Sequence, residues 1–270
     1  MRLILEPGLA SKNYWHDLWR YRELMYFLAW RDIVVRYRQT AIGFAWALIR
    51  PAVTMLVFVA FRRLTRIQPS ELPEPVLVFA AVLPWQFFSG ALTESSASLI
   101  GNSALISKVY FPRLMIPGAA VVTALVDFLI TLCLLAVLMT WYRVVPGWQL
   151  LTLPLFVLLT FGLSLGLGLA LAALNVEYRD FRYVVPFIVQ FGLFISPIAF
   201  TTADIPERWR TLYSLNPMVG IIDGFRWCVL HGHPPLDLQS VGFSIAVTAS
   251  TLFLGTWYFR RMERTFADVI

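Results

Sequence analysis

Long apolar stretches with few charged positions divide the chain into segments of similar length. There are six of them, at residues 41–61, 76–92, 116–141, 150–174, 184–200 and 241–259. An α-helix rises about 1.5 Å per residue, so about 20 residues cross the roughly 30 Å hydrocarbon core of a bilayer, with a range of about 17 to 25. All six stretches reach that range, although the second and fifth reach only its short end. The pattern predicts an all-α integral membrane protein with six transmembrane helices.

A different pattern precedes the first stretch, where residues 13–33 predict an amphipathic helix. Apolar positions recur at helical spacing, at Trp15, Leu18, Trp19, Tyr26, Ala29, Trp30 and Ile33. The charged positions fall elsewhere on the helical wheel, at Asp17, Arg20, Glu23 and Arg31. Trp and Arg suit a helix that lies flat at the headgroup level, and docking on a partner protein is the alternative. We therefore divide the chain into a cytoplasmic or interfacial amphipathic N-terminus, 1–40, and a six-span domain, 41–270.

Composition and charge agree with a membrane location. Of the 270 residues, 59% are hydrophobic and 14% are charged, whereas an ordinary soluble domain carries about 25% charged residues. With six spans both termini lie on one side, and that side collects most of the 22 Lys and Arg residues. The positive-inside rule then places both termini in the cytoplasm, although Arg62, Arg63 and Arg66 run against the bias. A net charge of +6 implies no nucleic-acid partner, because anionic lipid attracts cations to membrane edges.

Two charged residues lie inside the apolar stretches, Arg50 in the first and Asp127 in the third. An unpaired charge that faces lipid at such a depth costs at least about 2.5–3.5 kcal/mol. The two residues have opposite sign and similar depth, so we expect them to form a pair or to line a wet cavity. A buried ion pair that only fixes helix packing is the alternative.

Residues 204–232, between the fifth and sixth stretches, are too many for a simple turn. Asp204 and Asn216 are candidate helix caps, because Pro206 and Pro217 follow them at first-turn positions. The second of these helices carries an apolar stripe of Met218, Ile221, Ile222, Phe225 and Val229. We expect two short amphipathic helices that dip into the outer leaflet.

Two charged and aromatic loops are predicted on the cytoplasmic side. Residues 98–110 are expected to form a short helix that breaks before Pro112 and exposes apolar side chains rimmed by charge. The residues concerned are Leu105, Ile106, Lys108, Val109, Tyr110, Phe111 and Arg113. The second loop contributes Glu177, Tyr178, Arg179, Asp180 and Arg182. Exposed apolar residues with a charged rim indicate a docking surface, so both loops predict contact with a partner that supplies work.

At these residues the chain resembles the permease subunits of ABC transporters that export O-antigen, capsule or teichoic-acid polysaccharides. Four segments carry the resemblance, in order and with the expected spacings: RDIVVRYRQTAIGFAWALIRPAVTMLVFVAF, LPWQFFSGALTESSASLIGNSALISKVYFPRLMIP, ALNVEYRDFRYVVPF and LNPMVGIIDGFRW. The resemblance runs from about Trp19 to the C-terminus. It implies a homodimer in the bacterial inner membrane that binds two copies of a separate cytoplasmic ATPase. A lipid-linked polysaccharide would pass through a channel at the dimer interface.

The resemblance also implies roles for particular segments. The first loop would be a coupling helix seated in a groove of the ATPase, formed by Asn102 and the seven residues named above. The second loop would be a secondary contact, through Glu177, Tyr178, Arg179 and Asp180. Residues 13–33 correspond to the interface helix of the family. Residues 204–232 correspond to its outer gate helices, with Trp209, Tyr213, Met218, Ile222 and Phe225 as gate residues. ATP and Mg²⁺ would bind the partner, so we expect no cofactor on this chain and no enzymatic activity.

A channel for sugars favours aromatic residues, because apolar pyranose faces stack on rings. We expect Trp85 and Phe88 to line it, since Pro84 can kink their helix. Arg50 is a candidate for holding a lipid pyrophosphate, and Asp127 is placed in the same channel. The alternative is that the aromatic residues form the ordinary belt of a membrane protein.

Two other functions stay open. A related ABC permease would export a drug or another small molecule. A membrane glycosyltransferase would need paired carboxylates or a metal cluster, and the nearest candidates, Glu177 and Asp180, lie beside Arg179 and Arg182. Neither of the two cysteines belongs to a metal-binding motif, so no metal site is predicted. The chain has no phosphate loop of the form G-x-x-x-x-G-K-[ST], so nucleotide chemistry would lie on another polypeptide.

Overall fold

The computed structural model describes residues 14–38, 45–65, 72–108, 111–178 and 180–266. These residues form helices and connecting loops without a strand, which confirms the all-α class for them. The α-helices are α1 (Tyr14–Arg20), α2 (Arg22–Arg38), α3 (Ala45–Leu64), α4 (Glu74–Gly101), α5 (Ser103–Ile106), α6 (Met115–Trp141), α7 (Leu153–Glu177), α8 (Phe181–Ile195), α9 (Glu207–Tyr213), α10 (Pro217–Val229) and α11 (Leu238–Met262). Two short 3-10 helices are η1 (Trp148–Thr152) and η2 (Thr202–Asp204).

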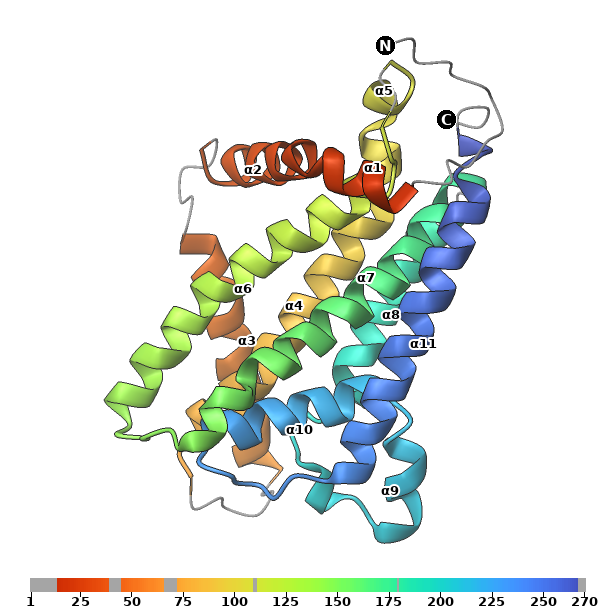
Figure 1. Cartoon of the computed structure of the whole chain (residues 1–270). Helices are drawn as coiled ribbons and strands as arrows, with labels where there is room; N and C mark the ends of the chain where they lie inside the picture. The colour runs from red at the N-terminus through yellow and green to blue at the C-terminus, as the bar shows by residue number, and fades with distance from the viewer. Residues whose placement is uncertain (1–13, 39–44, 66–71, 109–110, 179, 267–270) are drawn as a thin grey trace.

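The long helices form a bundle with two different ends (Figure 1). Helices α1, α2 and α5 lie at one end, which we call the α5 end. Helices α9 and α10 lie at the opposite end, which we call the α10 end. The last turn of α11 returns to the α5 end, so the chain segments nearest the two termini lie at the same end of the bundle.

Within the described residues, five helices are long and apolar enough to cross a membrane: α3, α4, α6, α11, and α7 together with η1. Helix α6 agrees with the predicted third span, 116–141, to within one residue. Helix α8 has 15 residues, about 22 Å, so the prediction of one apolar span over 184–200 is wrong at both of its limits. The helix ends because Ser196 precedes a proline, which drives Ser196 into extended backbone with ψ of 152°.

Helix α4 is longer than predicted and runs through the centre of the bundle. The predicted span, 76–92, stops where polar residues begin, but the helix continues to Gly101. Ser95 and Ser96 are buried and donate hydrogen bonds to the carbonyls of Leu92 and Thr93. Because these hydroxyls are satisfied inside their own helix, the polar residues do not end it. Helix α4 packs against both α6 and α7 along its length.

Helices α7 and α11 approach closely at a pair of glycines. A Cβ atom added to Gly255 would lie 2.0 Å from the carbonyl oxygen of Gly166, and one added to Gly166 would lie 2.6 Å from the backbone nitrogen of Leu252. Small residues allow backbones to approach in this way inside membranes. The contact fixes α11 against α7, so it links the two ends of the bundle through two full-length helices.

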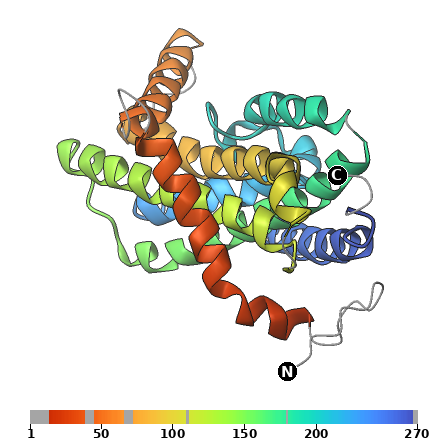
Figure 2. The same cartoon turned by 90° about the horizontal axis from the view of Figure 1, so that it is seen from above.

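The N-terminal amphipathic segment forms two helices instead of one, with a turn at Tyr21 between α1 and α2. Seen from above, α2 lies across α6 (Figure 2). It buries Leu28 and Ala29, whereas Trp19 of α1 and Trp30 of α2 are exposed. The predicted apolar face is therefore split: Ala29 packs on the bundle, whereas Trp19 and Trp30 are exposed. Exposed tryptophans suit helices at the headgroup level.

The prediction for the α10 end is confirmed in one half and wrong in the other. The Asn216 side chain accepts a hydrogen bond from the backbone of Met218 at 3.0 Å and caps α10, as predicted. Asp204 does not cap α9, because its carboxylate accepts hydrogen bonds from Thr201 and closes η2 instead. Helix α10 is buried on nearly every side, so it is a core helix of the bundle and lacks the exposed face that the prediction gave it.

Candidate functional site

The loop from α4 to α6 projects from the α5 end of the bundle (Figure 1). Helix α5 has only four residues and follows Asn102 directly, so the predicted helix over 98–110 is wrong in extent. Exposed residues at this tip are Gly101, Ala104, Ser107 and Lys108. Val109 and Tyr110 lie outside the described residues. The tip therefore presents small and cationic groups outward.

The apolar part of the same loop is turned inward. Ile106 is 7% exposed and Phe111 is 4% exposed, while Leu105 is half-buried. Ile106 and Phe111 join a buried cluster with Met115, Phe259 and Phe266. The prediction that Ile106 and Phe111 offer an apolar docking surface is wrong, because burying them in the chain's own core releases more free energy than leaving them in water.

Polar contacts hold both flanks of this loop. On the α4 side, the Arg31 guanidinium of α2 donates to the Asn102 side-chain oxygen at 2.9 Å. On the α6 side, the backbone amide of Arg113 donates to the Glu263 carboxylate at 2.8 Å, and its guanidinium donates to the Glu263 carbonyl at 2.6 Å. Burial raises the pKa of the Glu263 carboxyl, and the hydrogen bond from Arg113 opposes that shift. The loop is thus attached to the first helices and to the end of the last one.

The second predicted loop joins α7 to α8 and also lies at the α5 end (Figure 1). Glu177, Tyr178 and Asp180 are exposed, and Arg179 lies outside the described residues. Glu177 accepts a hydrogen bond from the Tyr258 hydroxyl at 3.3 Å. Two exposed loops at one end form a surface that a partner can contact.

Among the described residues, no group of three or more His, Cys, Asp and Glu side chains lies together as a metal site requires.

A charged cluster joins α2, α4 and α6 beneath the α5 end. The Arg36 guanidinium lies 2.6 Å from the Glu94 carboxylate and also donates to Asp127, which accepts from the Tyr37 hydroxyl as well. The side chains of Arg36, Glu94 and Asp127 are each about one-third exposed. Arg50 is exposed and makes no ion pair with Asp127. Of the two expectations for Arg50 and Asp127, the direct pair is absent, because α2 crosses α6 and places Arg36 against Asp127. A wet cavity lined by both residues stays a prediction.

The aromatic residues predicted for a channel lie in the core instead. Trp85 and Phe88 are 4% and 5% exposed, with ring centroids 5.6 Å apart. Trp85 packs on α8, where a Cβ atom added to Gly192 would meet its ring at 2.5 Å. Pro84 lies inside α4, but the helix continues through it and buries both rings. Neither ring faces an open surface of the chain.

A different set of aromatic residues is exposed along one side of α8. They are Tyr183, Phe187, Phe191 and Phe194. The ring centroids of Phe187 and Phe191 are 4.2 Å apart. Their spacing of three or four residues places them about one turn apart on one face of the helix. The i, i+4 spacing of these rings is visible in FRYVVPFIVQFGLFI, although the apolar content of the segment by itself predicts only a membrane span.

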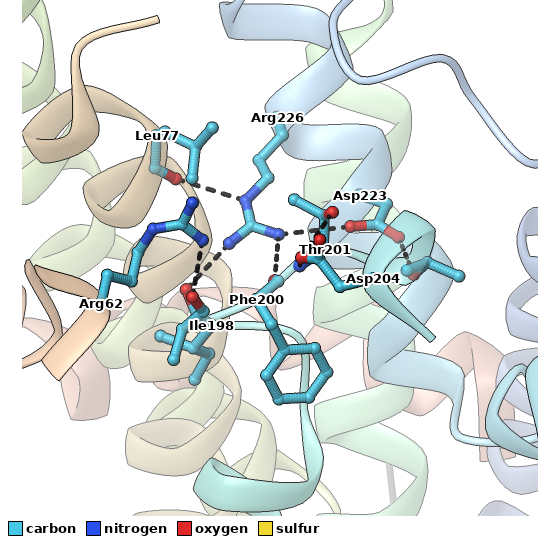
Figure 3. A network of polar contacts seen from close by, with 10 residues as sticks. Arg62, Leu77, Ile198, Phe200, Thr201, Asp204, Asp223 and Arg226 are labelled. Carbon is cyan, nitrogen blue, oxygen red and sulfur yellow. Dashed lines mark hydrogen bonds and ion pairs between the residues drawn. The ribbon is translucent and has the colours of Figure 1, made fainter. Parts of the chain in front are cut away.

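A buried polar network at the α10 end is the other feature that sequence reasoning missed (Figure 3). Arg226 of α10 is fully buried and donates to the carbonyls of Leu77, Ile198 and Phe200 at 3.2, 2.8 and 3.0 Å. Asp223 lies one turn away, 3.4 Å from the Arg226 guanidinium, and accepts from Thr202. The guanidinium thus satisfies the carbonyls of Ile198 and Phe200, which lie in the irregular segment after α8, and binds a carbonyl of α4 as well.

Arg62 of α3 completes this network. It is 3% exposed and donates to the carbonyl of Ala199 at 2.6 Å (Figure 3). Two buried arginines therefore hold the irregular segment 196–200. Charge alone places Arg62 with Arg63 and Arg66 among the cations that run against the positive-inside bias. The signal that was available is the Asp-Gly-Phe-Arg spacing, which puts two charges one turn apart within an apolar stripe.

The five predicted gate residues separate into two groups. Met218, Ile222 and Phe225 belong to α10 and are fully buried, with Phe225 in edge-to-face contact with Phe128 at 5.8 Å. Trp209 of α9 is exposed, and Tyr213 is partly buried against Phe200, with ring centroids 6.0 Å apart. Helix α9 is therefore the exposed part of this end, and α10 is its buried floor.

Comparison with known proteins gives a consistent result. The family described as ABC-2 type transporter matches residues 23–230. An O-antigen export system permease protein, RfbA, of Myxococcus xanthus is 30% identical over 257 residues, which cover 94% of this chain and 98% of the relative. RfbA of Klebsiella pneumoniae is 24% identical over 92% of this chain and 95% of its own. The polysialic acid transport protein KpsM of Escherichia coli is 24% identical over 86% and 91%, respectively. The names describe transport components and no enzyme.

Proposed function

The chain belongs to the ABC-2 type transporter family, and from this premise we propose that it is the membrane-spanning subunit of an ATP-driven polysaccharide exporter. Its substrate would be a lipid-linked, O-antigen-like polysaccharide that crosses the bacterial inner membrane. The observation that carries the proposal is the similarity to an O-antigen export permease over almost the whole length of both chains. Several long apolar helices support a multi-pass membrane location.

In this proposal the chain crosses the membrane six times, with α8 as the fifth passage. Helix α8 is too short alone, and residues 196–200 extend it toward the α10 end. Irregular backbone is tolerated at membrane depth where protein buries it and satisfies its polar groups. Arg62 and Arg226 do so for the carbonyls of residues 198–200. Six passages put both termini on one side, and the excess of Lys and Arg supports the cytoplasm.

The channel is proposed to lie between two copies of the chain, along the exposed face of α8. Tyr183, Phe187, Phe191 and Phe194 give that face one aromatic ring per turn. Sugar units can slide past aromatic rings without being held at one position, because stacking on apolar pyranose faces tolerates different hydroxyl patterns. These four residues replace Trp85 and Phe88 as the proposed channel lining, because the side chains of Trp85 and Phe88 are buried in the core.

The α5 end is proposed to receive the ATPase. The tip around Lys108 would seat in the ATPase, and the loop with Tyr178 and Asp180 would make a second contact. ATP and Mg²⁺ would bind only the partner. Closure of two ATPases would then move the two tips as rigid bodies and alternate the access of the channel.

Export in the source bacterium tests the proposal. Replacing the native gene with a Phe187→Ala/Phe191→Ala variant should strongly reduce polysaccharide on the cell surface, measured on gels of extracted lipopolysaccharide. The variant chain should remain in the membrane and still co-purify with an ATPase. Phe253→Ala, which removes an exposed ring from α11, is the matched control and should export normally.

Normal surface polysaccharide after deletion of the gene would contradict the proposal. If deletion instead changed only resistance to a drug, the small-molecule alternative would replace it. Absence of any ATPase from the purified wild-type chain would contradict the ATP-driven mechanism.

A further inference from the structure

The turn that follows α11 packs directly on the loop between α5 and α6. We call residues 263–266 the C-terminal turn. Glu263 accepts the backbone amide of Arg113 at 2.8 Å with its side chain and the Arg113 guanidinium at 2.6 Å with its carbonyl. These two residues are 150 positions apart in the chain. The turn therefore makes a specific, two-point contact with the segment that leads into α6.

An apolar contact lies beside the polar one. Phe266 is buried with Phe111 and Phe259, and the rings of Phe259 and Phe266 meet edge to face at 5.4 Å. The Arg113 guanidinium lies 6.0 Å from the Phe266 ring centroid. Both residues that flank Pro112 are thus held by the C-terminal turn. The N-terminal helices reach the same place, since Arg260 lies over the Tyr14 ring at 4.6 Å.

Helix α5 depends on such contacts for its position. Four residues form a single turn, and an isolated turn is unstable because nucleating a helix costs more than one hydrogen bond returns. The tip itself is exposed at Ser107 and Lys108. Its position therefore depends on the buried side chain of Ile106 and on its two flanks, where Arg31 holds Asn102 and Glu263 holds Arg113.

Helix stability does not explain why a carboxylate stands at this position. Glu263 is the C-cap of α11, where the helix dipole disfavours negative charge. Its side chain is also partly buried, which disfavours the ionised form further. Among the groups that offset these costs, the hydrogen bond from the Arg113 amide contributes most, followed by Tyr14 and by the positive charges of Arg113 and Arg260.

We propose that Glu263 is a positioning residue that clamps the α5–α6 loop to the end of α11. The inference rests on the proposed function, in which an ATPase pushes on the α5 tip. With the clamp in place, a push on the tip is transmitted to α6 and α11 together. Without it, the segment around Pro112 bends and the push is lost, so ATP is hydrolysed with little transport.

The test measures export per ATP hydrolysed. The full complex is purified for phosphate release, and surface polysaccharide is measured in cells that carry the same variant. Glu263→Ala should keep the ATPase bound and hydrolysis within about twofold, while export per ATP falls about tenfold, the size expected for loss of a charge-assisted hydrogen bond. Glu263→Gln keeps an acceptor for the Arg113 amide and should stay near wild type. Arg264→Ala changes an exposed neighbour and should have no effect.

Two outcomes would overturn the clamp. One is an unchanged ratio of export to hydrolysis in Glu263→Ala. The other applies if Glu263→Ala fails to accumulate in membranes, in which case Phe266→Leu is measured instead. This variant keeps the cluster apolar but removes the ring beside Arg113, so it should lower the ratio of export to hydrolysis partly. An unchanged ratio in Phe266→Leu would contradict the clamp. A wild-type chain that binds no ATPase would instead contradict the proposed function, so the two failures are distinguishable.

Discussion

The two ends of the bundle hold their charges in different ways. At the α10 end, Arg62 and Arg226 are buried, and most of their partners are backbone carbonyls of neighbouring segments. At the α5 end, Arg31 and Arg36 are partly exposed, and their partners are the side chains of Asp32, Asn102, Glu94 and Asp127. If a buried arginine side chain moves away, several backbone carbonyls lose their hydrogen-bond partner, which costs free energy. Partly exposed pairs exchange with water at little cost.

This difference matches different tasks in the proposed transporter. The α10 end is built as a fixed block in which one guanidinium of α10 binds α4 and the segment that follows α8. The α5 end is built from contacts that can rearrange when a partner moves. Charged residues in one membrane protein can thus fix the backbone rigidly at one end and form exchangeable ion pairs at the other.

The largest effect is expected from breaking the fixed end. Arg226→Met leaves the carbonyls of Leu77, Ile198 and Phe200 and the Asp223 carboxylate without their buried partner. Breaking a buried ion pair on one side costs about 3–5 kcal/mol, so the variant should unfold far more readily in detergent. Thermal unfolding followed by circular dichroism measures this. Arg208→Met, which changes an exposed arginine on α9, is the control, and equal midpoints for the two variants would contradict a fixed block.

The second effect concerns the link between the ends. Gly255→Ala places a Cβ atom 2.0 Å from the Gly166 carbonyl oxygen, and overpacking of this kind costs about 1–3 kcal/mol. A Cβ atom at Gly242 on the same helix meets nothing within 4 Å, so Gly242→Ala should gain up to about 1 kcal/mol from helix propensity. The same unfolding assay checks both variants. A stable Gly255→Ala would mean that α7 and α11 can separate freely.

The sequence predicted the fold best where an element is defined by its own residues. Helix α6 is one unbroken apolar run, and Asn216 with Pro217 starts α10 as local capping rules require. Prediction failed where a local signal was read too simply: Ser196 before a proline ends α8 early, and the serines after residue 92 do not end α4. These failures concern boundaries and leave the class unchanged.

The charged contacts were predicted poorly because they join distant parts of the chain. Arg36 meets Asp127 across 91 positions, and Arg226 meets Leu77 across 149. No spacing rule connects such positions, so the sequence offers Arg50 as a candidate partner of Asp127 and gives no sign of Arg36. The burial of Phe111 was missed for the same reason, since the helix end that covers it comes last in the sequence.

The α5 end should tolerate the loss of its central arginine better than the α10 end tolerates loss of Arg226. Arg36→Met leaves Glu94 and Asp127 without a cation, but all three side chains are about one-third exposed, so water screens the carboxylates. We expect a loss of about 1 kcal/mol in the unfolding assay. Arg38→Met changes an exposed arginine of the same helix and is the control. A loss as large as that of Arg226→Met would end the distinction between the two ends.

The smallest effect on stability is expected from Arg31→Met, which removes the hydrogen bond to Asn102. Arg31 is partly exposed and also pairs with Asp32, so its loss should cost about 0.5 kcal/mol. Its effect on transport should be larger than its effect on stability, because Asn102 leads directly into α5. Comparing the unfolding midpoint with surface polysaccharide in the same variant separates the two effects. Normal export from Arg31→Met would show that the C-terminal turn alone suffices to position the tip, whereas export that falls while the midpoint holds would show that α5 needs both of its flanks.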